Sequence, residues 1–320
     1  MNRQPVVQAH GLHQTLALFL ALAAGFVLRA QPPEPPGATF SANADLVLLN
    51  ATVRTRKGGF VPGLGKTDFQ VLEDGVPQTI RIFQRQDAPV AIGLVVDHSG
   101  SMRPKRHDVA AAAVAFVRSS NPQDQMFIVN FNGHVSFGLP PTQLFSASPA
   151  SLEDALNGVP WSGRTALYDA IAAGLTRLGE TSLERKVLIV ISDGGDNASH
   201  HQRQQVLDAA VRSGAVIYTI GLFDPDDTDQ DPGLLKQLAQ VSGGRAFLPR
   251  ETPEIVPVCE RIAEEIRNQY TIGYAPAKPP GDCRFRRIQV RVTARGGSGD
   301  LVRTRTGYIS CPERQEASRP

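Results

Sequence analysis

Five side chains that carry oxygen lie in three separate segments of the chain. Asp97, Ser99 and Ser101 are spaced by two residues in DHSGS, Thr165 ends SGRT, and Asp193 begins DGGDN. Carboxylate and hydroxyl oxygens bind Mg²⁺, Mn²⁺ or Ca²⁺, and the lack of a cysteine or a well-placed histidine among them disfavours zinc. A cation held by this set would be incompletely neutralised, so it would attract a further anion.

The elements that precede these side chains can bring them together. Val90–Val96 (VAIGLVV) and Val187–Ile191 (VLIVI) are continuous apolar runs, as expected for strands that are buried on both faces of a parallel sheet. Asp97 and Asp193 follow these runs within two residues, and Thr165 directly precedes a predicted helix. Open α/β sheets bind ligands at the carboxyl ends of their strands, so we expect all five side chains at that edge.

Residues 89–250 alternate between apolar runs and amphipathic stretches. This alternation predicts a doubly wound α/β fold with a mostly parallel sheet and helices on both faces. The remaining strands are predicted at Met126–Phe131, Ala215–Leu222 and Ala246–Leu248, and the helices at Val109–Val117, Ala166–Leu178, Gln204–Arg212 and Leu234–Val241. A connecting helix is predicted at Glu254–Asn268, within residues 251–269, where Ile255, Val258, Ile262 and Ile266 form an apolar stripe.

The segments on either side of this domain are rich in β pattern. Residues 45–88 contain an alternating run and a hairpin signal at Asp74-Gly75, and residues 270–312 contain a second alternating run from Ile288. Neither segment alone would form a stable sandwich. We expect them to pack together as one β-sandwich-like unit, with the α/β domain inserted between them and a short tail at 313–320.

The three segments together resemble the von Willebrand factor type A (VWA) family and its metal-ion-dependent adhesion site. The family pattern is D-x-S-x-S, then a distant Thr, then a strand that ends in Asp, and every position is present here. The flanks, with DFQVLEDGVPQ and TGYIS, look like a bacterial group of VWFA-related domain proteins. The resemblance implies a Rossmann-like fold over residues 89–250. It also implies direct coordination by Ser99, Ser101 and Thr165, with Asp97 and Asp193 acting directly or through water.

The same resemblance implies a function in binding. The remaining coordination position of the metal would take an Asp or Glu of a protein partner, so we expect an adhesion or protein-binding module and no enzyme. A structural envelope scaffold that binds through the β flanks is an alternative. A metal-dependent hydrolase with Asp97 as nucleophile is a further alternative, but Ser99 stands where such enzymes need a second acid.

The N-terminus has the features of an export signal. Residues 1–30 contain Arg3 and the uncharged apolar run Leu16–Leu28, which suits the core of a signal peptide and is short for a membrane span. Cleavage after Ala30 would leave a Pro-rich linker at residues 31–44, and an uncleaved membrane anchor is the alternative. We expect a secreted, periplasmic or cell-envelope protein.

The charge balance argues against a nucleic-acid binder. The 33 basic residues include Arg3 and Arg29, and the first 30 residues hold no acid, so the rest of the chain balances its 31 acidic residues. Two charged segments stand out locally. The acidic loop Asp224–Asp231 is expected to be solvated, with a calcium loop as the alternative. Arginines of the late β segment are expected on a solvated sheet face, with contact to anionic cell-surface polymers as the alternative: Arg284, Arg286, Arg287, Arg291, Arg295, Arg303 and Arg305.

Two of the three cysteines can pair. Cys283 and Cys311 lie symmetrically about Gly297, so a single hairpin would place them opposite each other at a distance that a disulfide can bridge. Two reduced buried thiols are the alternative. The step from Phe285 to Ile288 breaks the alternation and suggests a β-bulge. Cys259 lies in a helical pattern and is expected in the core.

Overall fold

The computed structural model describes residues 46–85, 88–224, 230–278, 281, 283–293 and 301–311. The predicted signal peptide (1–30), linker (31–44) and tail (313–320) lie outside the described residues. Residues Ala44–Pro320 form one compact unit. Within the described part of the chain, no helix has both the length and the apolar character needed to cross a membrane.

A six-stranded sheet forms the centre of the α/β part. Its order is β10-β9-β8-β5-β6-β7, and all neighbours are parallel except the edge strand β7, which runs antiparallel to β6. Val95 of β5 lies beside Val129 of β6 and Val190 of β8, which places β5 in the middle. The strands are β5 (Ala91–Asp97), β6 (Gln125–Phe131), β7 (Val135–Phe137), β8 (Lys186–Ser192), β9 (Val216–Gly221) and β10 (Ala246–Phe247).

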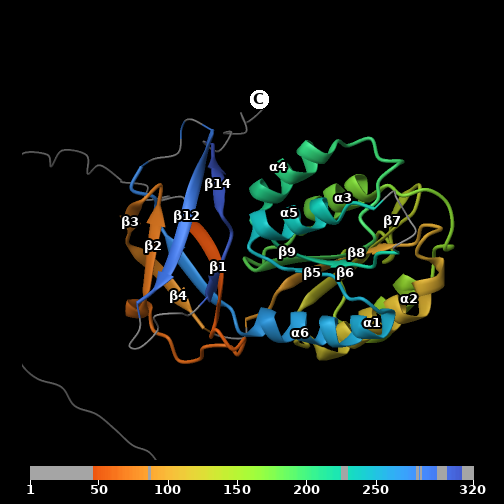
Figure 1. Cartoon of the computed structure of the whole chain (residues 1–320), viewed down its shortest axis with the longest axis horizontal. Coiled ribbons are helices and arrows are strands. Elements are labelled where there is room, and N and C mark those ends of the chain that lie inside the picture. The colour runs from red at the N-terminus through yellow and green to blue at the C-terminus, as the bar shows by residue number, and fades with distance from the viewer. Residues whose placement is uncertain are drawn as a thin grey trace, which may run out of the picture. The chain divides into compact units, whose positions relative to one another are not determined.

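Helices cover both faces of this sheet, which confirms the predicted doubly wound fold (Figure 1). Helices α3, α4 and α5 lie on one face, and α1, α2 and α6 lie on the other. The bounds are α1 (Arg106–Ser119), α2 (Pro149–Leu156), α3 (Leu167–Gly179), α4 (Arg203–Ser213), α5 (Pro232–Ser242) and α6 (Ile255–Arg267). Three short 3₁₀ helices occur at η1 (Lys66–Asp68), η2 (Arg103–Lys105) and η3 (Thr252–Glu254). The sequence pattern predicted neither α2 nor β7.

Close packing fixes α3 against the middle of the sheet. A Cβ atom at Gly174 of α3 would lie 2.8 Å from Leu188 of β8, and one at Gly93 of β5 would lie 2.5 Å from Phe127. These glycines therefore let the helix and the neighbouring side chains approach the central strands. Because Thr165 lies just before α3, this packing also sets where its loop can lie.

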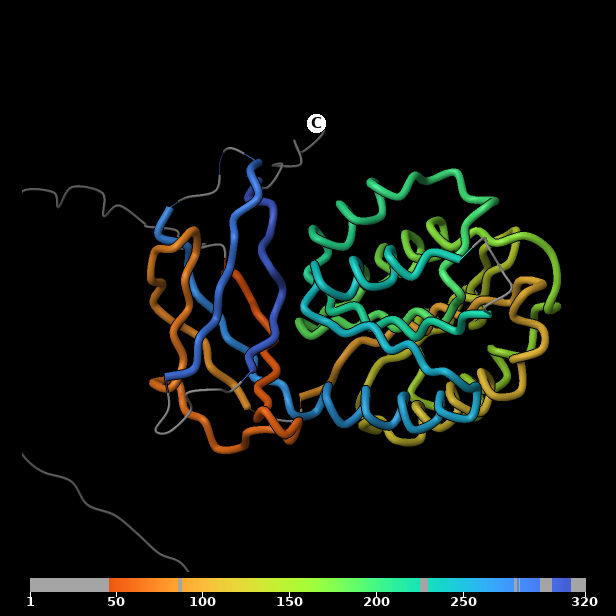
Figure 2. The backbone as a smooth tube through the Cα atoms, in the orientation of Figure 1, coloured from red at the N-terminus to blue at the C-terminus, as the bar shows by residue number. Residues whose placement is uncertain are grey.

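The flanking segments combine into two antiparallel sheets, ordered β13-β1-β11-β4 and β14-β12-β2-β3. Figure 2 shows the early strands beside the late, blue strands. Leu49, Val71, Tyr270 and Ile288 share one core, which therefore draws on both flanks and both sheets. The strands are β1 (Val47–Arg54), β2 (Phe69–Glu73), β3 (Val76–Gln78), β4 (Ile80–Gln84), β11 (Tyr270–Tyr274), β12 (Arg284–Val292), β13 (Leu301–Arg303) and β14 (Gly307–Ser310).

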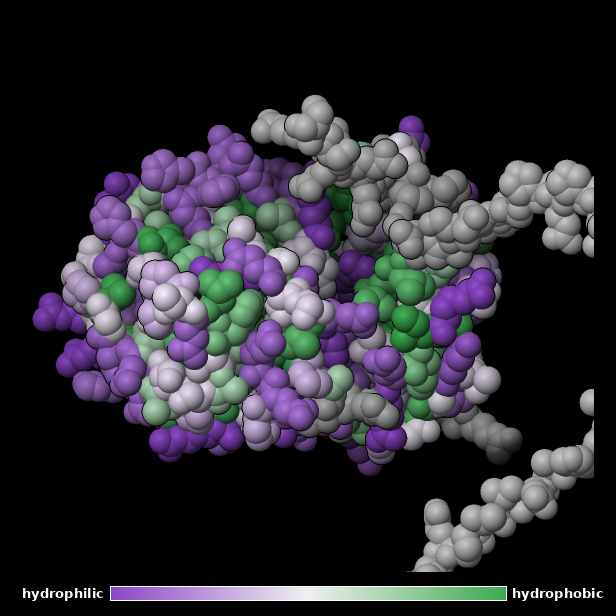
Figure 3. Space-filling model, turned by 180° about the vertical axis from the view of Figure 1, so that it is seen from behind, coloured by the Kyte–Doolittle hydropathy of each residue, from purple (hydrophilic) through white to green (hydrophobic). Residues whose placement is uncertain are grey.

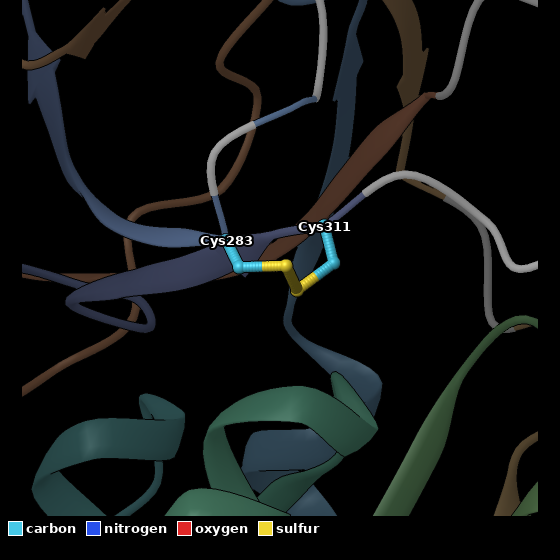
Figure 4. The surroundings of a disulfide bond; sticks show 2 residues. All are labelled: Cys283 and Cys311. Atoms are coloured by element: carbon cyan, nitrogen blue, oxygen red, sulfur yellow. A yellow bond between two sulfur atoms is a disulfide. The ribbon is translucent and has the colours of Figure 1, made fainter.

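The late β segment is not one simple hairpin. After β12 the chain enters the other sheet as β13, which pairs with β1, and only then returns as β14 to pair with the start of β12. Arg284 lies opposite Ser310, so the register is still centred on Gly297. Cys283 and Cys311 form a disulfide with their Cα atoms 4.1 Å apart (Figure 4).

The expected bulge in β12 is absent from the described pairing. Burial alternates along the strand, with Arg286 and Ile288 inward and Phe285 outward, and the pairings with β14 and β2 show no register shift. The sequence suggested a break in the alternation because Arg286, a charged residue, occupies an inward position. The guanidinium of Arg286 lies 3.0 Å from Glu73 of β2, so the charge is paired inside the sandwich.

Figure 3 shows one face of the molecule, where hydrophilic and hydrophobic residues are interspersed. On the face shown in Figure 3, hydrophobic residues form separate groups among hydrophilic ones. Exposed large apolar side chains include Phe285 and Leu301 in the late β segment. Single exposed apolar residues of this kind are ordinary on protein surfaces.

Candidate metal site

Asp97 is the last residue of the central strand β5, and its side chain is fully buried. Its Oδ1 accepts a hydrogen bond from the backbone N–H of Ser99 at 2.8 Å, and its Oδ2 accepts one from the Ser192 hydroxyl at 2.6 Å. Ser192 ends the neighbouring strand β8, so the two strand ends are tied together through this carboxylate. The carboxylate is therefore held in one orientation at the carboxyl edge of the sheet.

Two serine hydroxyls connect the first strand end to the second carboxylate. The hydroxyl oxygens of Ser99 and Ser101 are 3.1 Å apart, and the Ser101 hydroxyl donates to Asp193 Oδ2 at 2.5 Å. Asp193 Oδ1 accepts from the backbone N–H of Gly195 at 3.2 Å. Four of the five predicted side chains are thus brought together by direct contacts: Asp97, Ser99, Ser101 and Asp193.

The loop that carries Thr165 is fastened to both strand ends through its backbone. The N–H of Gly100 donates to the carbonyl of Gly163 at 3.2 Å, and the N–H of Thr165 donates to Oδ1 of Asn197 at 2.9 Å. The Thr165 carbonyl in turn accepts from the N–H of Asn197 at 2.9 Å. Gly163 has φ of +92°, which favours glycine at this turn. Thr165, which is 6% exposed, therefore lies against the loop that follows β8.

The electrostatics of the set favour a bound cation. Burial, and next the nearby charge of Asp193, raise the pKa of Asp97 to about 6 from an ordinary value of 3.8. Two carboxylates at one buried edge destabilise each other when both are ionised, and a divalent cation would remove that repulsion. Two carboxylates with three hydroxyls form the all-oxygen donor set that Mg²⁺ or Ca²⁺ prefers. Among the described residues, no group of three or more His, Cys, Asp or Glu side chains is placed to hold a metal.

Several residues that support the site were not singled out from the sequence. Ser192 bridges Asp97 to the N–H of Gly194, and Asn197 holds the Thr165 loop. Asp196 accepts from the backbone N–H of Tyr168 in the first turn of α3 at 3.0 Å. The only available signal was the run of polar residues after β8, because their roles depend on contacts between distant loops.

His98, between two of the candidate ligands, points away from them. It is fully buried, its Nε2 lies 3.1 Å from Asn130 Oδ1, and its ring centroid is 4.0 Å from that of Trp161. Burial lowers the pKa of His98, which favours the neutral imidazole. Trp161, which is half-buried, also lines a cavity of about 420 Å³ together with Arg103, Arg106, Pro160 and Ser162.

The other charged segments have mixed roles. Most of the acidic loop, residues 225–229, lies outside the described residues, whereas Asp231 caps α5 by accepting from the N–H of Leu234 at 2.8 Å. The expectation that the late arginines all lie on a solvated face is wrong for Arg286, which is buried against Glu73. Arg303 likewise pairs with the buried carboxylate of Glu265.

Comparison with known proteins agrees with this architecture. The family model described as von Willebrand factor type A domain matches residues 92–195, a range that contains all five candidate ligands. No curated protein matches the chain. A solved structure described as von Willebrand factor type A from Catenulispora acidiphila is 12% identical, with a TM-score of 0.50, and the match covers 88% of this chain and 78% of that one.

Two further solved structures have TM-scores of 0.49. One is the vWF domain of a type V pili tip protein from Porphyromonas gingivalis, 13% identical, with 56% of this chain and 95% of that one covered. The other is proximal thread matrix protein 1 from the mussel byssus with a zinc-occupied MIDAS motif, 18% identical, with 61% of this chain covered. The chain spans about half of the mussel protein, 49% of its length. Residues 92–195 thus match the von Willebrand factor type A domain in sequence, and they lie within the doubly wound α/β part.

Proposed function

We propose that this chain is an exported binding protein whose VWA domain holds a divalent cation and uses it to bind an acidic group on a protein partner. One observation carries the proposal. A continuous chain of direct contacts runs from Asp97, through the backbone N–H and the hydroxyl of Ser99, to the Ser101 hydroxyl and Asp193 at the carboxyl edge of the sheet. Thr165 lies on a loop fastened to both ends of that line.

The donor set supports Mg²⁺ as the preferred ion, with Mn²⁺ and Ca²⁺ as the other candidates. The proposal assigns Ser99, Ser101 and Thr165 as direct ligands and Asp97 and Asp193 as ligands or as acceptors for metal-bound water. When bound, the cation would act as a Lewis acid toward a carboxylate oxygen. The hydroxyls bring no charge of their own, so the partner's carboxylate would complete the neutralisation.

The surroundings of the site favour an acidic partner. Arg103 and Arg106 follow the Ser101 loop, Arg164 precedes Thr165, and all three side chains are exposed. A partner that presents Asp or Glu would approach a positive rim before reaching the cation. The cavity beside Trp161 could receive a neighbouring residue of the same partner segment.

Features of the site support binding over catalysis. A hydrolase would need a general base within reach of the bound substrate. His98 is the nearest histidine in sequence, but it is fully buried and directed at Asn130. Asp97, the alternative nucleophile, has both of its oxygens occupied by donors from Ser99 and Ser192.

The proposed export is supported by the disulfide between Cys283 and Cys311. Structural disulfides form and persist mainly in oxidising compartments, such as the periplasm or the extracellular space. A secreted, periplasmic or cell-envelope location is therefore part of the proposal.

The proposal is tested by calorimetric titration of Mg²⁺, Mn²⁺ and Ca²⁺ into chelator-treated protein. Ser101→Ala removes one exposed hydroxyl ligand, and Ser162→Ala removes an exposed hydroxyl from the Thr165 loop as a matched control. We expect saturable binding that weakens at least about tenfold in Ser101→Ala and stays unchanged in Ser162→Ala. An acidic peptide should then bind only when the metal is present.

Two outcomes would contradict the proposal. Equal metal affinity in both variants would remove Ser101 from the site. No metal binding by the wild-type chain, even with an acidic peptide in the cell, would leave the scaffold alternative, in which the β flanks bind the partner.

A further inference from the structure

A second candidate site lies away from the metal site, where α5 and α6 approach the strands of the β sandwich. Two cavities, of about 1000 Å³ and about 750 Å³, open there. They share two lining residues, Arg245 and Arg303, and so lie next to each other; we call the two cavities together the basic groove. None of the five candidate metal ligands lines it.

The lining of the basic groove is strongly positive. The larger cavity adds Lys236, Arg287 and Arg305 to the two shared arginines. The smaller cavity adds Arg54, Arg56, Lys57 and Arg261. Glu264 is the one acidic residue that lines either cavity. A chain whose formal net charge is only +2 thus has nine cationic side chains in the lining of two adjacent cavities.

Part of this charge has a structural purpose. Glu265 is fully buried beneath the groove and pairs with Arg54 at 3.0 Å and with Arg303. It also accepts a hydrogen bond from the Tyr218 hydroxyl at 2.8 Å. These two arginines therefore serve to join the β sandwich to the α/β part, and one carboxylate offsets only one of their two charges.

Three of the other arginines that line the groove have no acidic partner in the part of the chain that the structure describes. Within the described part of the chain, no carboxylate forms an ion pair with Arg245, Arg261 or Arg305. Burial, followed by the nearby charges of Arg54 and Arg261, lowers the pKa of Arg245. The Nε of Arg305 is buried and, among the described residues, has no hydrogen-bond partner. Like charges that repel and a buried donor without an acceptor both favour a bound anion.

We propose that the basic groove binds an acidic polysaccharide. Two adjacent cavities, both lined by cations, suit a linear ligand that carries repeated negative charges. Arginine forms bidentate hydrogen bonds with carboxylate and with other oxyanions, which suits uronate and sulfate groups alike. Two threonines with partly exposed side chains line the cavities and can hydrogen-bond to sugar hydroxyls: Thr55 and Thr306.

The aromatic side chains favour a polysaccharide over a single-stranded nucleic acid. Binding of single strands depends on aromatic rings on which bases stack. In the smaller cavity the Arg54 guanidinium lies 4.3 Å above the Phe60 ring, so one face of that ring is already covered. Phe285, which is 50% exposed, is the single aromatic residue that lines the larger cavity.

The test measures binding of heparin (a sulfated polysaccharide) and polygalacturonate (a carboxylated one) in chelator at about 0.15 M salt, where exposed charges are largely screened beyond about 8 Å. Poly-glutamate and single-stranded DNA serve as comparison polyanions. The groove variant combines Lys236→Gln, Arg261→Gln and Arg287→Gln, which are exposed positions. The control variant has the same net charge and combines Arg81→Gln, Arg212→Gln and Arg250→Gln, which are exposed positions outside both cavities.

We expect at least one of the two polysaccharides to bind without metal, and the groove variant to bind it about tenfold or more weakly, from three lost charge contacts. The control variant should bind as the wild type does. Preference for the sulfated or the carboxylated polymer identifies which anion the groove takes. Both variants are melted alongside the wild type, and an unchanged melting temperature assigns the loss to the groove.

Three results would overturn the proposal. If polysaccharide binding weakened equally in the groove variant and the control variant, the polymer would be attracted to positive charge anywhere on the surface and not to the groove. Tighter groove-dependent binding of poly-glutamate or of DNA would replace the polysaccharide with that polymer class. No retention of either polysaccharide at this salt concentration would refute it outright. Every polysaccharide measurement is made in chelator, so its failure would not affect the proposed metal-dependent function. Failure of the metal titration would likewise not affect the proposed polysaccharide site.

Discussion

The stability of the metal-free protein should depend on the charge of Asp97. Its pKa is raised from 3.8 to about 6 because the side chain is buried and lies near Asp193. A carboxyl whose pKa is higher in the folded state than in the unfolded chain stabilises the fold at low pH. That stabilisation is lost as the pH rises through the folded-state value. The relevant window therefore runs from about pH 4 to about pH 6.

The magnitude follows from the two pKa values. We take the pKa of Asp97 as 3.8 in the unfolded chain and about 6 in the folded protein. Proton linkage then gives a loss of about 2 kcal/mol in the free energy of unfolding when the pH rises from about 4.5 to about 7. Asp97→Asn removes the charge and keeps the shape, although its amide cannot accept from both Ser99 and Ser192. The variant should therefore show no such loss, apart from a constant offset of about 1 kcal/mol for the hydrogen bond.

The assay is urea unfolding in chelator at several pH values, with wild type and Asp97→Asn measured side by side. Subtracting the variant cancels groups that titrate identically in the two proteins. The wild type should lose about 2 kcal/mol relative to the variant across the window and regain stability at pH 7 when Mg²⁺ is added. The free energy of unfolding of the wild type minus that of the variant could instead stay constant or rise with pH. That result would mean that the hydrogen bonds from Ser99 and Ser192 lower the pKa of Asp97 by at least as much as burial and Asp193 raise it, and it would refute the reasoning.

Three further predictions concern the fold. Glu265→Gln should cost about 3 kcal/mol or more in urea unfolding because it leaves the partners of a buried carboxylate uncompensated, whereas the exposed neighbour Glu264→Gln should be nearly neutral. Gly244→Ala should destabilise by about 3 kcal/mol or more because its Cβ would lie 1.9 Å from the Ile217 carbonyl; Gly158→Ala, with open space around it, is the control, and equal unfolding midpoints would contradict this. Reducing the disulfide, with its sequence separation of 28, should cost about 3–4 kcal/mol, measured by melting with and without reductant; an unchanged melting temperature would count against it.

Much of the α/β fold could be predicted because its signals are local. Continuous apolar runs identified β5 and β8, and helical periodicity identified α3 and α6, each within two residues of the observed bounds. The missed elements are short. Strand β7 has three residues, and α2 buries only Leu152, Ala155 and Leu156, so neither shows a full period.

The candidate ligands could be proposed from the sequence because their spacing is a local signal. The residues that hold them in place could not. The D-x-S-x-S spacing is visible in the sequence, but the roles of Ser192 and Asn197 depend on contacts across 95 and 32 residues. The inward position of Arg286 was missed because its partner, Glu73, lies 213 residues away. A charged residue in a strand is ordinarily taken as outward-facing, and only the tertiary structure shows otherwise.

The insertion of the α/β part between β4 and β11 has a mechanical consequence. A pull applied between residue 46 and residue 311 acts on the β sandwich, because β1 and β14 are the first and last strands of the described chain. The tension must separate β1 from β11 and β13 before it can extend the inserted residues. The disulfide keeps residues 283–311 from lengthening under the same load. The α/β part therefore lies outside the segment that carries the load, and it should stay folded while the β sandwich resists the pull.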